Sequence, residues 1–179
     1  LIDRALAGFA SNRPRPALVQ VPIDVLGATS PAAPTPIPYI AAAEPPAAAL
    51  SVVADLLRNA RKPLLILGGG ARGAAAELHP LIERRALAVL PTYAARGILP
   101  DDHPRSFGAM SYGPSSESLI AEADLVIAIG TELGETDFGR PYLGHSAPLV
   151  RVDLDPRVLA DRHRAEYSIL ADASCFAKA

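Results

Sequence analysis

P-L-L-I-L-G-G-G-A-R-G, residues 63–73, is the stretch that decides the fold of this chain. The apolar run 64–67 is typical of a buried parallel strand. Gly68, Gly70 and Gly73 follow it with the spacing G-x-G-x-x-G, and residues 74–85 have the apolar spacing of a helix. This order predicts a nucleotide-type α/β unit, because such a turn lets backbone N–H groups approach a phosphate.

The glycine motif alone does not identify a ligand. An NAD site also needs an acidic residue at the end of the second strand, about 20 residues further on, to hold the ribose. The second strand is predicted at 86–90, and Pro91, Thr92 and Tyr93 follow it without a carboxylate. Three interpretations stay open: the glycines only allow tight strand–helix packing, they hold a nucleotide-like group, or they hold NAD, which the missing carboxylate disfavours.

Strands and helices alternate along the rest of the chain. Further apolar runs predict strands at 125–129, 149–152 and 168–170. Helical spacing recurs at 47–60, 115–123, 156–162 and from 173 onward. This alternation predicts an α/β, Rossmann-like, doubly wound fold: a mostly parallel sheet with helices on both faces.

In such sheets, ligands bind at the carboxyl ends of the strands. The residues at those ends include Gly68–Gly70, Thr92, Gly130, Asp153 and Asp172. Asp153 and Asp172 have two open interpretations, hydrogen bonding to ribose hydroxyls and capping of the next helix. For Asp155, which precedes Pro156, capping is the preferred interpretation.

Composition excludes several function classes. The chain has 179 residues and a net charge of −2, from 17 basic and 19 acidic residues, which favours neither nucleic acid nor an anionic membrane as a partner. No apolar run approaches the ~20 residues of a membrane span. The single cysteine, Cys175, fits a reducing compartment, so we expect a cytoplasmic protein. The histidines lack ligand spacing, and we expect neither a metal site nor a catalytic residue in this chain.

Proline divides the chain into segments. Residues 29–46 are rich in proline and alanine and are predicted to form an extended linker. A helix over 1–10 and a short strand over 17–21 are predicted before it, and a regular domain over 47–179 after it. Because the chain does not begin with Met, we expect it to be a piece of a longer protein.

Five motifs in a fixed order carry a family resemblance. They are V-Q-V-P-I-D-V (19–25), L-L-I-L-G-G-G (64–70), L-P-T-Y-A-A-R-G-I-L-P-D-D-H-P (90–104), A-D-L-V-I-A-I-G (123–130) and V-R-V-D-L-D-P (150–156). Over essentially its whole length the chain resembles the central domain of thiamine-diphosphate-dependent enzymes of the acetolactate synthase and 2-oxoacid decarboxylase group. The stretch 131–138 resembles acetolactate-synthase-like decarboxylases, including those acting on guanidino 2-oxoacids, more than synthases proper.

The resemblance implies which domains the segments of this chain belong to and where the cofactors of the longer enzyme bind. Residues 1–28 would be the C-terminal remnant of a pyrimidine-binding domain, and 47–179 the central domain. Thiamine diphosphate and Mg2+ would bind between the pyrimidine and pyrophosphate domains of the longer enzyme, since this chain contains no G-D-G motif. The chain alone is therefore expected to be inactive. Its expected partners are those two neighbouring domains and further copies in a homo-oligomer, a dimer or tetramer.

In part of this family the central domain binds FAD, in a few members ADP, and in others the cleft is empty. The positions that match the family's nucleotide contacts are Gly69, Gly70, Thr92, Gly108, Gly130, Asp153 and Asp172. The pair Arg96-Gly97 is expected in a loop beside the cleft or the neighbouring domain.

One departure from the family pattern bears on the nucleotide. Glu132 stands where flavin-binding synthases carry an arginine, and Glu135 and Asp137 follow it. Three carboxylates beside a diphosphate would repel it. The stretch 107–113 also lacks the histidine of the synthases. FAD binding and a vacant structural domain both stay open, and the alternative function is a self-contained nucleotide-binding module, a flavoprotein or an NAD-using domain.

Overall fold

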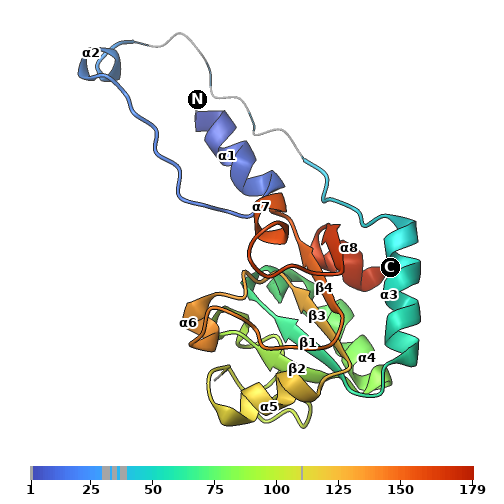
Figure 1. Cartoon of the computed structure of the whole chain (residues 1–179). Coiled ribbons are helices and arrows are strands. Elements are labelled where there is room, and N and C mark those ends of the chain that lie inside the picture. Colours follow the sequence, from blue (N-terminus) through green and yellow to red (C-terminus); the bar gives the residue numbers. More distant parts are fainter. Residues whose placement is uncertain (1, 30–32, 34–35, 37–39, 110) are drawn as a thin grey trace. The chain divides into compact units, whose positions relative to one another are not determined.

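Five parallel strands form a single sheet in the order β2-β1-β3-β4-β5 in the computed structural model (Figure 1). The structure describes residues 2–29, 33, 36, 40–109 and 111–179. All neighbouring strands pair in parallel. The strands are β1 (Pro63–Leu67), β2 (Ala88–Pro91), β3 (Leu125–Ile129), β4 (Leu149–Asp153) and β5 (Tyr167–Leu170).

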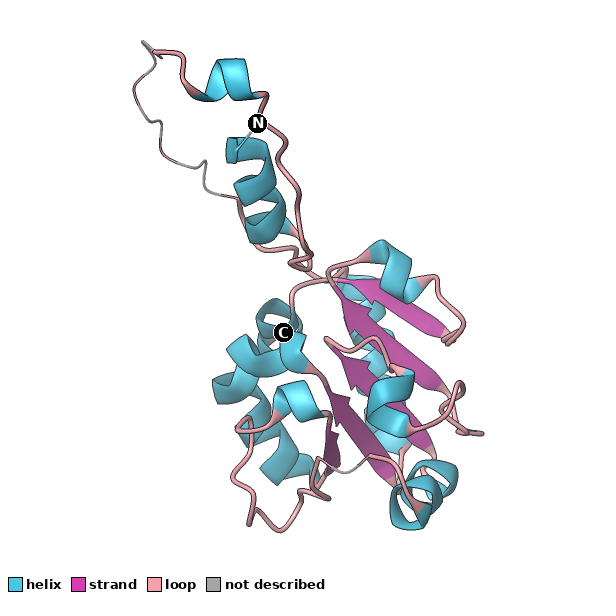
Figure 2. Cartoon of the chain, turned by 90° about the vertical axis from the view of Figure 1, so that its left-hand side faces the viewer, coloured by secondary structure: helices cyan, strands magenta, loops and turns pink. Residues whose placement is uncertain are grey.

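Helices cover both faces of this sheet (Figure 2). One face packs against α3 (Ala47–Asn59), α4 (Ala75–Arg85) and α8 (Ala173–Lys178). The other packs against α5 (Pro114–Glu122) and α6 (Glu135–Phe138), while α7 (Pro156–Leu159) lies between β4 and β5 in the chain. The α/β, Rossmann-like, doubly wound fold expected from the sequence is confirmed.

The strand sequences explain the two layers. Successive strand side chains point to opposite faces, so Leu65 and Leu67 enter the core under α3 and α4, whereas Leu64 and Ile66 enter the core under α5. All four side chains are buried. A parallel strand covered by helices on both faces needs such an unbroken apolar run.

The glycine turn is joined to the end of β3 by backbone contacts. The strand order reverses between β1 and β3, and at this point the Gly68 N–H donates to the Ile129 carbonyl (2.9 Å) and the Gly70 N–H to the Gly130 carbonyl (3.1 Å). A Cβ on Gly70 would lie 2.9 Å from the Gly130 Cα. Gly130 has a φ of +61°, and a Cβ there would lie 2.6 Å from the carbonyl carbon of Gly70. Only residues without side chains allow this approach.

Several boundaries differ from the sequence predictions. The helix predicted from residue 74 is preceded by a 3-10 turn, η1 (Gly69–Ala74), and the second strand begins at Ala88. Ala86 cannot start that strand, because it ends α4 in the left-handed region with φ +51°. The helix predicted over 156–162 ends at Leu159, where the chain turns so that Asp161 accepts a hydrogen bond from the His163 N–H (2.7 Å).

The strand predicted over 17–21 is wrong. These residues are described and adopt no regular structure, and Leu18 and Val21 are exposed. A strand needs a hydrogen-bonded neighbour, and none of the strands among the described residues pairs with this segment.

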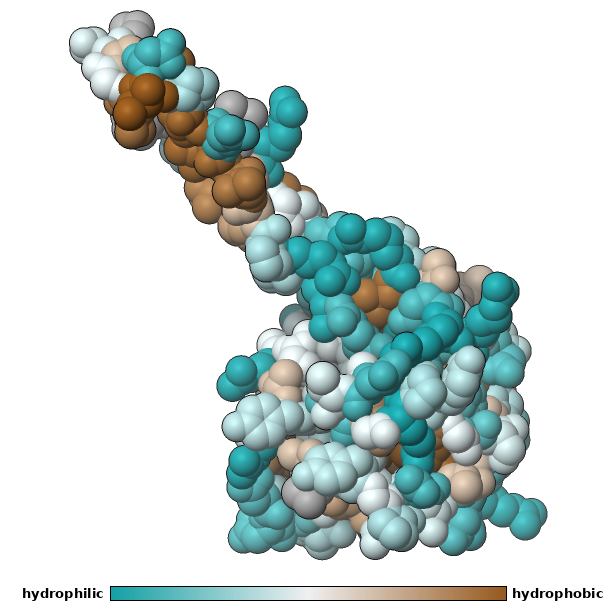
Figure 3. All heavy atoms as spheres, turned by 60° about the vertical axis from the view of Figure 1, so that its left-hand side comes forward, coloured by the Kyte–Doolittle hydropathy of each residue, from teal (hydrophilic) through white to brown (hydrophobic). Residues whose placement is uncertain are grey.

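The chain divides into two units, Leu1–Ala42 and Ala43–Ala179. In the first, α1 (Ile2–Ser11) and α2 (Ile23–Leu26) contain no buried residue. Figure 3 shows apolar side chains gathered on one face of this unit, beside hydrophilic ones. Its exposed large apolar side chains include Leu18, Val19, Val21, Ile23, Val25 and Leu26. Of the predicted linker 29–46, residues 30–32, 34–35 and 37–39 lie outside the described residues, and 43–46 belong to the second unit.

Substituting Gly130 by alanine is expected to lower the free energy of unfolding by about 2–4 kcal/mol, because the new Cβ combines left-handed strain with overlap on the glycine turn. Urea denaturation at 25 °C measures this loss. Gly73→Ala is the matched control, since a Cβ there meets only the Ser174 Oγ, at 3.6 Å, and its effect should stay within about 1 kcal/mol. Equal losses of stability in the two variants would contradict the claim that Gly130 makes a close backbone contact with the glycine turn.

Candidate functional site

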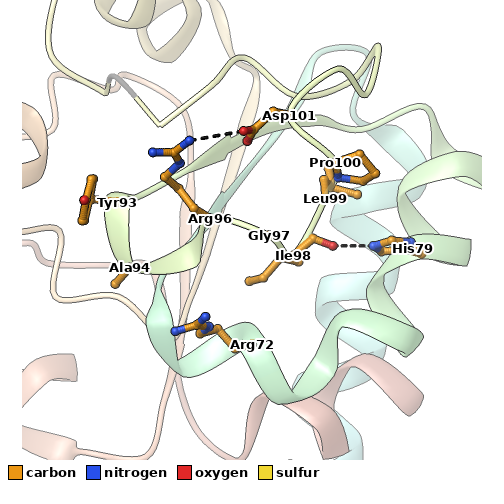
Figure 4. Close-up of a pocket in the computed structure, with 10 residues that line it drawn as sticks. All are labelled: Arg72, His79, Tyr93, Ala94, Arg96, Gly97, Ile98, Leu99, Pro100 and Asp101. Atoms are coloured by element: carbon orange, nitrogen blue, oxygen red, sulfur yellow. Dashed lines mark hydrogen bonds and ion pairs between the residues drawn. The ribbon is translucent and has the colours of Figure 1, made fainter.

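A large hollow lies beside the glycine turn, with a volume of about 910 Å³. Figure 4 shows its lining: Arg72 from η1, His79 from α4, and a run of residues that follows β2. The full lining is Arg72, His79, Tyr93, Ala94, Arg96, Gly97, Ile98, Leu99, Pro100 and Asp101.

A second hollow of about 490 Å³ adjoins the first and shares Tyr93, Arg96 and Asp101 with it. Its remaining lining comes from the segment before α5 and from α6, and consists of Gly108, Ala109, Tyr112, Thr136 and Asp137. The 3-10 turn η2 (Tyr93–Ala95) and Arg96 after it therefore form the wall between the two hollows.

The lining of the larger hollow includes two guanidinium groups, Arg72 and Arg96, and one carboxylate, Asp101. Arg96 Nη2 pairs with Asp101 Oδ2 at 3.2 Å, and both side chains are more than half exposed. No ion pair joins Arg72 to any other residue that the structure describes. His79 Nε2 contacts the Ile98 carbonyl, which ties the loop to α4 (Figure 4). The hollow thus carries an excess of positive charge.

None of the predicted site residues belongs to the lining of the larger hollow. Gly69 and Gly70 belong to the close contact of the glycine turn with η2 and the end of β3, which we call the joint. A Cβ on Gly69 would lie 3.1 Å from the Ala94 Cβ. Thr92 is buried, and its N–H donates to the Leu67 carbonyl (2.8 Å). Gly108, with φ +75°, is the one predicted contact that lines a described hollow, the smaller one.

The predicted aspartates take part in local turns. Asp172 Oδ1 accepts from the Ser174 N–H (2.8 Å) and the Cys175 N–H (3.2 Å), which makes it the N-cap of α8. Asp153 Oδ1 accepts from the Asp155 N–H (2.9 Å). Asp155 in turn accepts from the Arg157 N–H (2.9 Å) and caps α7, as predicted. Of the two interpretations of Asp172, the structure shows capping.

The three carboxylates expected to crowd a diphosphate lie outside the larger hollow. Glu135 pairs with Arg162 at 2.6 Å. Asp137 lines the smaller hollow only, and Glu132 lines neither. None of the three carboxylates therefore lines the larger hollow, although Asp137 shares the smaller hollow with Arg96.

Sequence reasoning missed Arg72, although it occupies a variable position inside the glycine motif. It placed Arg96 in a loop beside the nucleotide cleft or the neighbouring domain, and in the structure Arg96 lines both hollows. It also missed Arg151 of β4, although a lone arginine between valines at 150–152 marks a charge inside a buried strand.

Arg151 is 1% exposed and holds the segment that follows β3 in place. Its guanidinium contacts both carboxylate oxygens of Asp161, at 2.6 and 3.2 Å. It also donates to the backbone carbonyls of His163 (3.0 Å) and Thr131 (3.4 Å). This buried network fixes Thr131, and with it the end of β3 at Gly130, against β4.

The histidine in this network is buried and favours its neutral form. Burial lowers the pKa of His163 below its ordinary value of 6.5, although the neighbouring Asp161 charge acts in the opposite direction. The Leu133 backbone also acts to raise this pKa, and Leu133 is a buried residue with φ +52°.

Asp161→Ala is expected to lower the free energy of unfolding by about 3 kcal/mol, because it leaves the Arg151 charge buried without its carboxylate partner. Urea denaturation at pH 7 measures the effect. Asp55→Ala is the matched control, since its pair with Arg58 is more than half exposed, and its effect should be below about 1 kcal/mol. A loss at Asp161 no larger than at Asp55 would contradict the structural role of the network.

Among the residues that the structure describes, no group of three or more His, Cys, Asp and Glu side chains could hold a metal ion. Within the same residues, no helix has the length and apolar character needed to cross a membrane.

The family model of the thiamine pyrophosphate enzyme central domain matches residues 50–179. The chain belongs to this family. A probable 2-ketoarginine decarboxylase of Pseudomonas aeruginosa is 42% identical over 97% of the chain and 31% of the relative. An acetolactate synthase of Mycobacterium bovis is 32% identical over 91% of the chain and 28% of the relative. The chain thus spans about a third or less of the length of these relatives.

Among solved structures, the benzoylformate decarboxylase of Polynucleobacter necessarius superposes with a TM-score of 0.73 at 23% identity. The match covers 94% of this chain and 33% of that protein. At this identity the likeness establishes the fold.

Proposed function

We propose that this chain is the non-catalytic central domain of a thiamine pyrophosphate-dependent decarboxylase or carboligase that acts on a 2-oxo acid. The family match over 50–179 supports this proposal, as do relatives named 2-ketoarginine decarboxylase and acetolactate synthase. Because the chain spans about a third of those relatives, the whole protein's catalytic groups and its substrate pocket belong to the rest of the enzyme. Thiamine diphosphate and Mg2+ bind there, and this chain supplies no catalytic residue.

In this proposal the chain positions its neighbours. Residues 1–28 complete a pyrimidine-binding domain, 29–46 form the linker and 47–179 form the central domain. The exposed apolar side chains of the first unit, such as Leu18 and Ile23, support this assignment, because they need a neighbour to cover them. The neighbouring pyrimidine and pyrophosphate domains, and further copies in a cytoplasmic dimer or tetramer, are the partners.

The larger hollow binds FAD or ADP in the same proposal. The observation that carries this step is the hollow at Arg72 and Arg96, whose volume of about 910 Å³ falls in the range of small-molecule sites, roughly 300–1,000 Å³. Guanidinium groups suit a diphosphate, and the ring of Tyr93, 75% exposed, offers an aromatic face. FAD would supply a redox-active ring when bound, while the residues of this chain bind and orient the nucleotide.

A second candidate is a structural domain with a vacant cleft. The contact between Gly70 and Gly130 favours it, because that contact explains the glycine motif without any ligand. A self-contained NAD-using module has less support, since β2 ends at Pro91 and Thr92 with no carboxylate for the ribose.

Calorimetric titration of the 179-residue chain with FAD, ADP and NAD tests the nucleotide proposal. We expect saturable one-site binding of FAD or ADP, together with a ligand-dependent rise in the unfolding temperature, because a ligand of the folded state stabilises it. No binding of FAD or ADP would support the vacant structural domain. Tight binding of NAD alone would contradict the proposal.

A further inference from the structure

Three backbone amides of the glycine turn, those of Gly68, Gly70 and Ala71, are already hydrogen-bonded. The N–H groups of Gly68 and Gly70 donate to carbonyls at the end of β3, at 2.9 and 3.1 Å, and the Ala71 N–H donates to the Gly68 carbonyl at 3.0 Å. A phosphate could reach these donors only by replacing bonds that the fold already makes. Such an exchange yields little net free energy and would open the joint between β1 and β3.

The start of α4 does not directly follow β1, because the 3-10 turn η1 lies between them. This helix begins at Ala75, behind the 3-10 turn η1, and Ala71 and Ala74 of that turn are fully buried. The first turn of α4 is only partly buried, with Leu78 in the core and Ala76 exposed. The amides of Gly68, Gly70 and Ala71, at the place where a phosphate usually binds in this type of fold, are therefore not free for a ligand.

Two arginine side chains remain for an anion in the larger hollow. Arg72 is exposed and makes no ion pair with another described residue, and its side chain lines the hollow (Figure 4). Arg96 pairs with Asp101, but both partners are more than half exposed, so the pair is weak and an oligophosphate can displace the carboxylate. Planar guanidinium groups bind phosphate oxygens through two parallel hydrogen bonds.

We infer that Arg72 and Arg96 hold the phosphates of the nucleotide and that the glycine turn serves as a packing joint. This inference rests on the proposed nucleotide binding and names the residues that carry it out. The binding determinant is thus an arginine inside the G-x-G-x-x-G motif, at one of its variable positions.

Calorimetric titration of four purified chains with ADP and AMP tests the inference: wild type, Arg72→Gln, Arg96→Gln and Arg61→Gln. Arg61 is the matched control, because it is also exposed and carries the same charge but lies just before β1, at the amino-terminal edge of the sheet. We expect Arg72→Gln and Arg96→Gln to weaken ADP binding roughly tenfold or more, as the loss of a charge-assisted hydrogen bond implies. Arg61→Gln should stay within about twofold of wild type, allowing for long-range screening.

The preference for ADP over AMP gives a second readout. It should shrink in Arg72→Gln and Arg96→Gln, because the second phosphate loses its partner, and Arg72→Lys should restore part of it. Equal urea midpoints of the four chains establish that the folds are intact. Wild-type ADP affinity in Arg72→Gln and Arg96→Gln would overturn the inference while leaving nucleotide binding in place. Absence of ADP and AMP binding to the wild-type chain would overturn the proposed nucleotide binding itself.

Discussion

The backbone contact between the glycine turn and the end of β3 is the constraint on which the rest of this structure depends. The turn after β1 and the strand β3 meet where the strand order reverses, and Gly70 and Gly130 touch there without side chains between them. Folds of this type usually bind their ligands at such a point. In this chain the protein's own backbone fills it, so the neighbouring β2 loop and η1 form the hollow instead.

Because of this contact, the polar groups that stabilise the fold are different from those that line the larger hollow. Asp172 caps α8, Asp153 shapes the turn into α7, and Arg151 fixes the segment after Gly130, so these polar groups stabilise the fold. The exposed side chains of Arg72, Tyr93 and Arg96 line the larger hollow, where a ligand can reach them. The family match identifies residues 50–179 as a central domain of thiamine pyrophosphate enzymes. The three side chains named above form part of the surface of this domain.

The sequence predicted the fold well because its signals were local. Four-residue apolar runs such as 64–67 and the helical spacing at 47–60 identify elements without knowledge of their neighbours. The candidate site was harder, because the role of an amide or a carboxylate depends on distant partners: Gly70 donates to Gly130, and Asp161 meets Arg151. The strand expected at 17–21 is wrong for the same reason, since no local pattern provides the neighbouring strand that it needs.

Amide hydrogen exchange at Gly68 and Gly70, measured by NMR with and without saturating ADP, tests the central claim most directly. If these amides belong to the close contact with β3, both exchange slowly in the ligand-free chain. Saturating ADP then slows them no more than it slows other core amides, because it only stabilises the whole folded chain. Rapid exchange in the free chain that becomes slow only when ADP is added would contradict the claim. It would show that these N–H groups donate to the phosphates and not to the carbonyls at the end of β3.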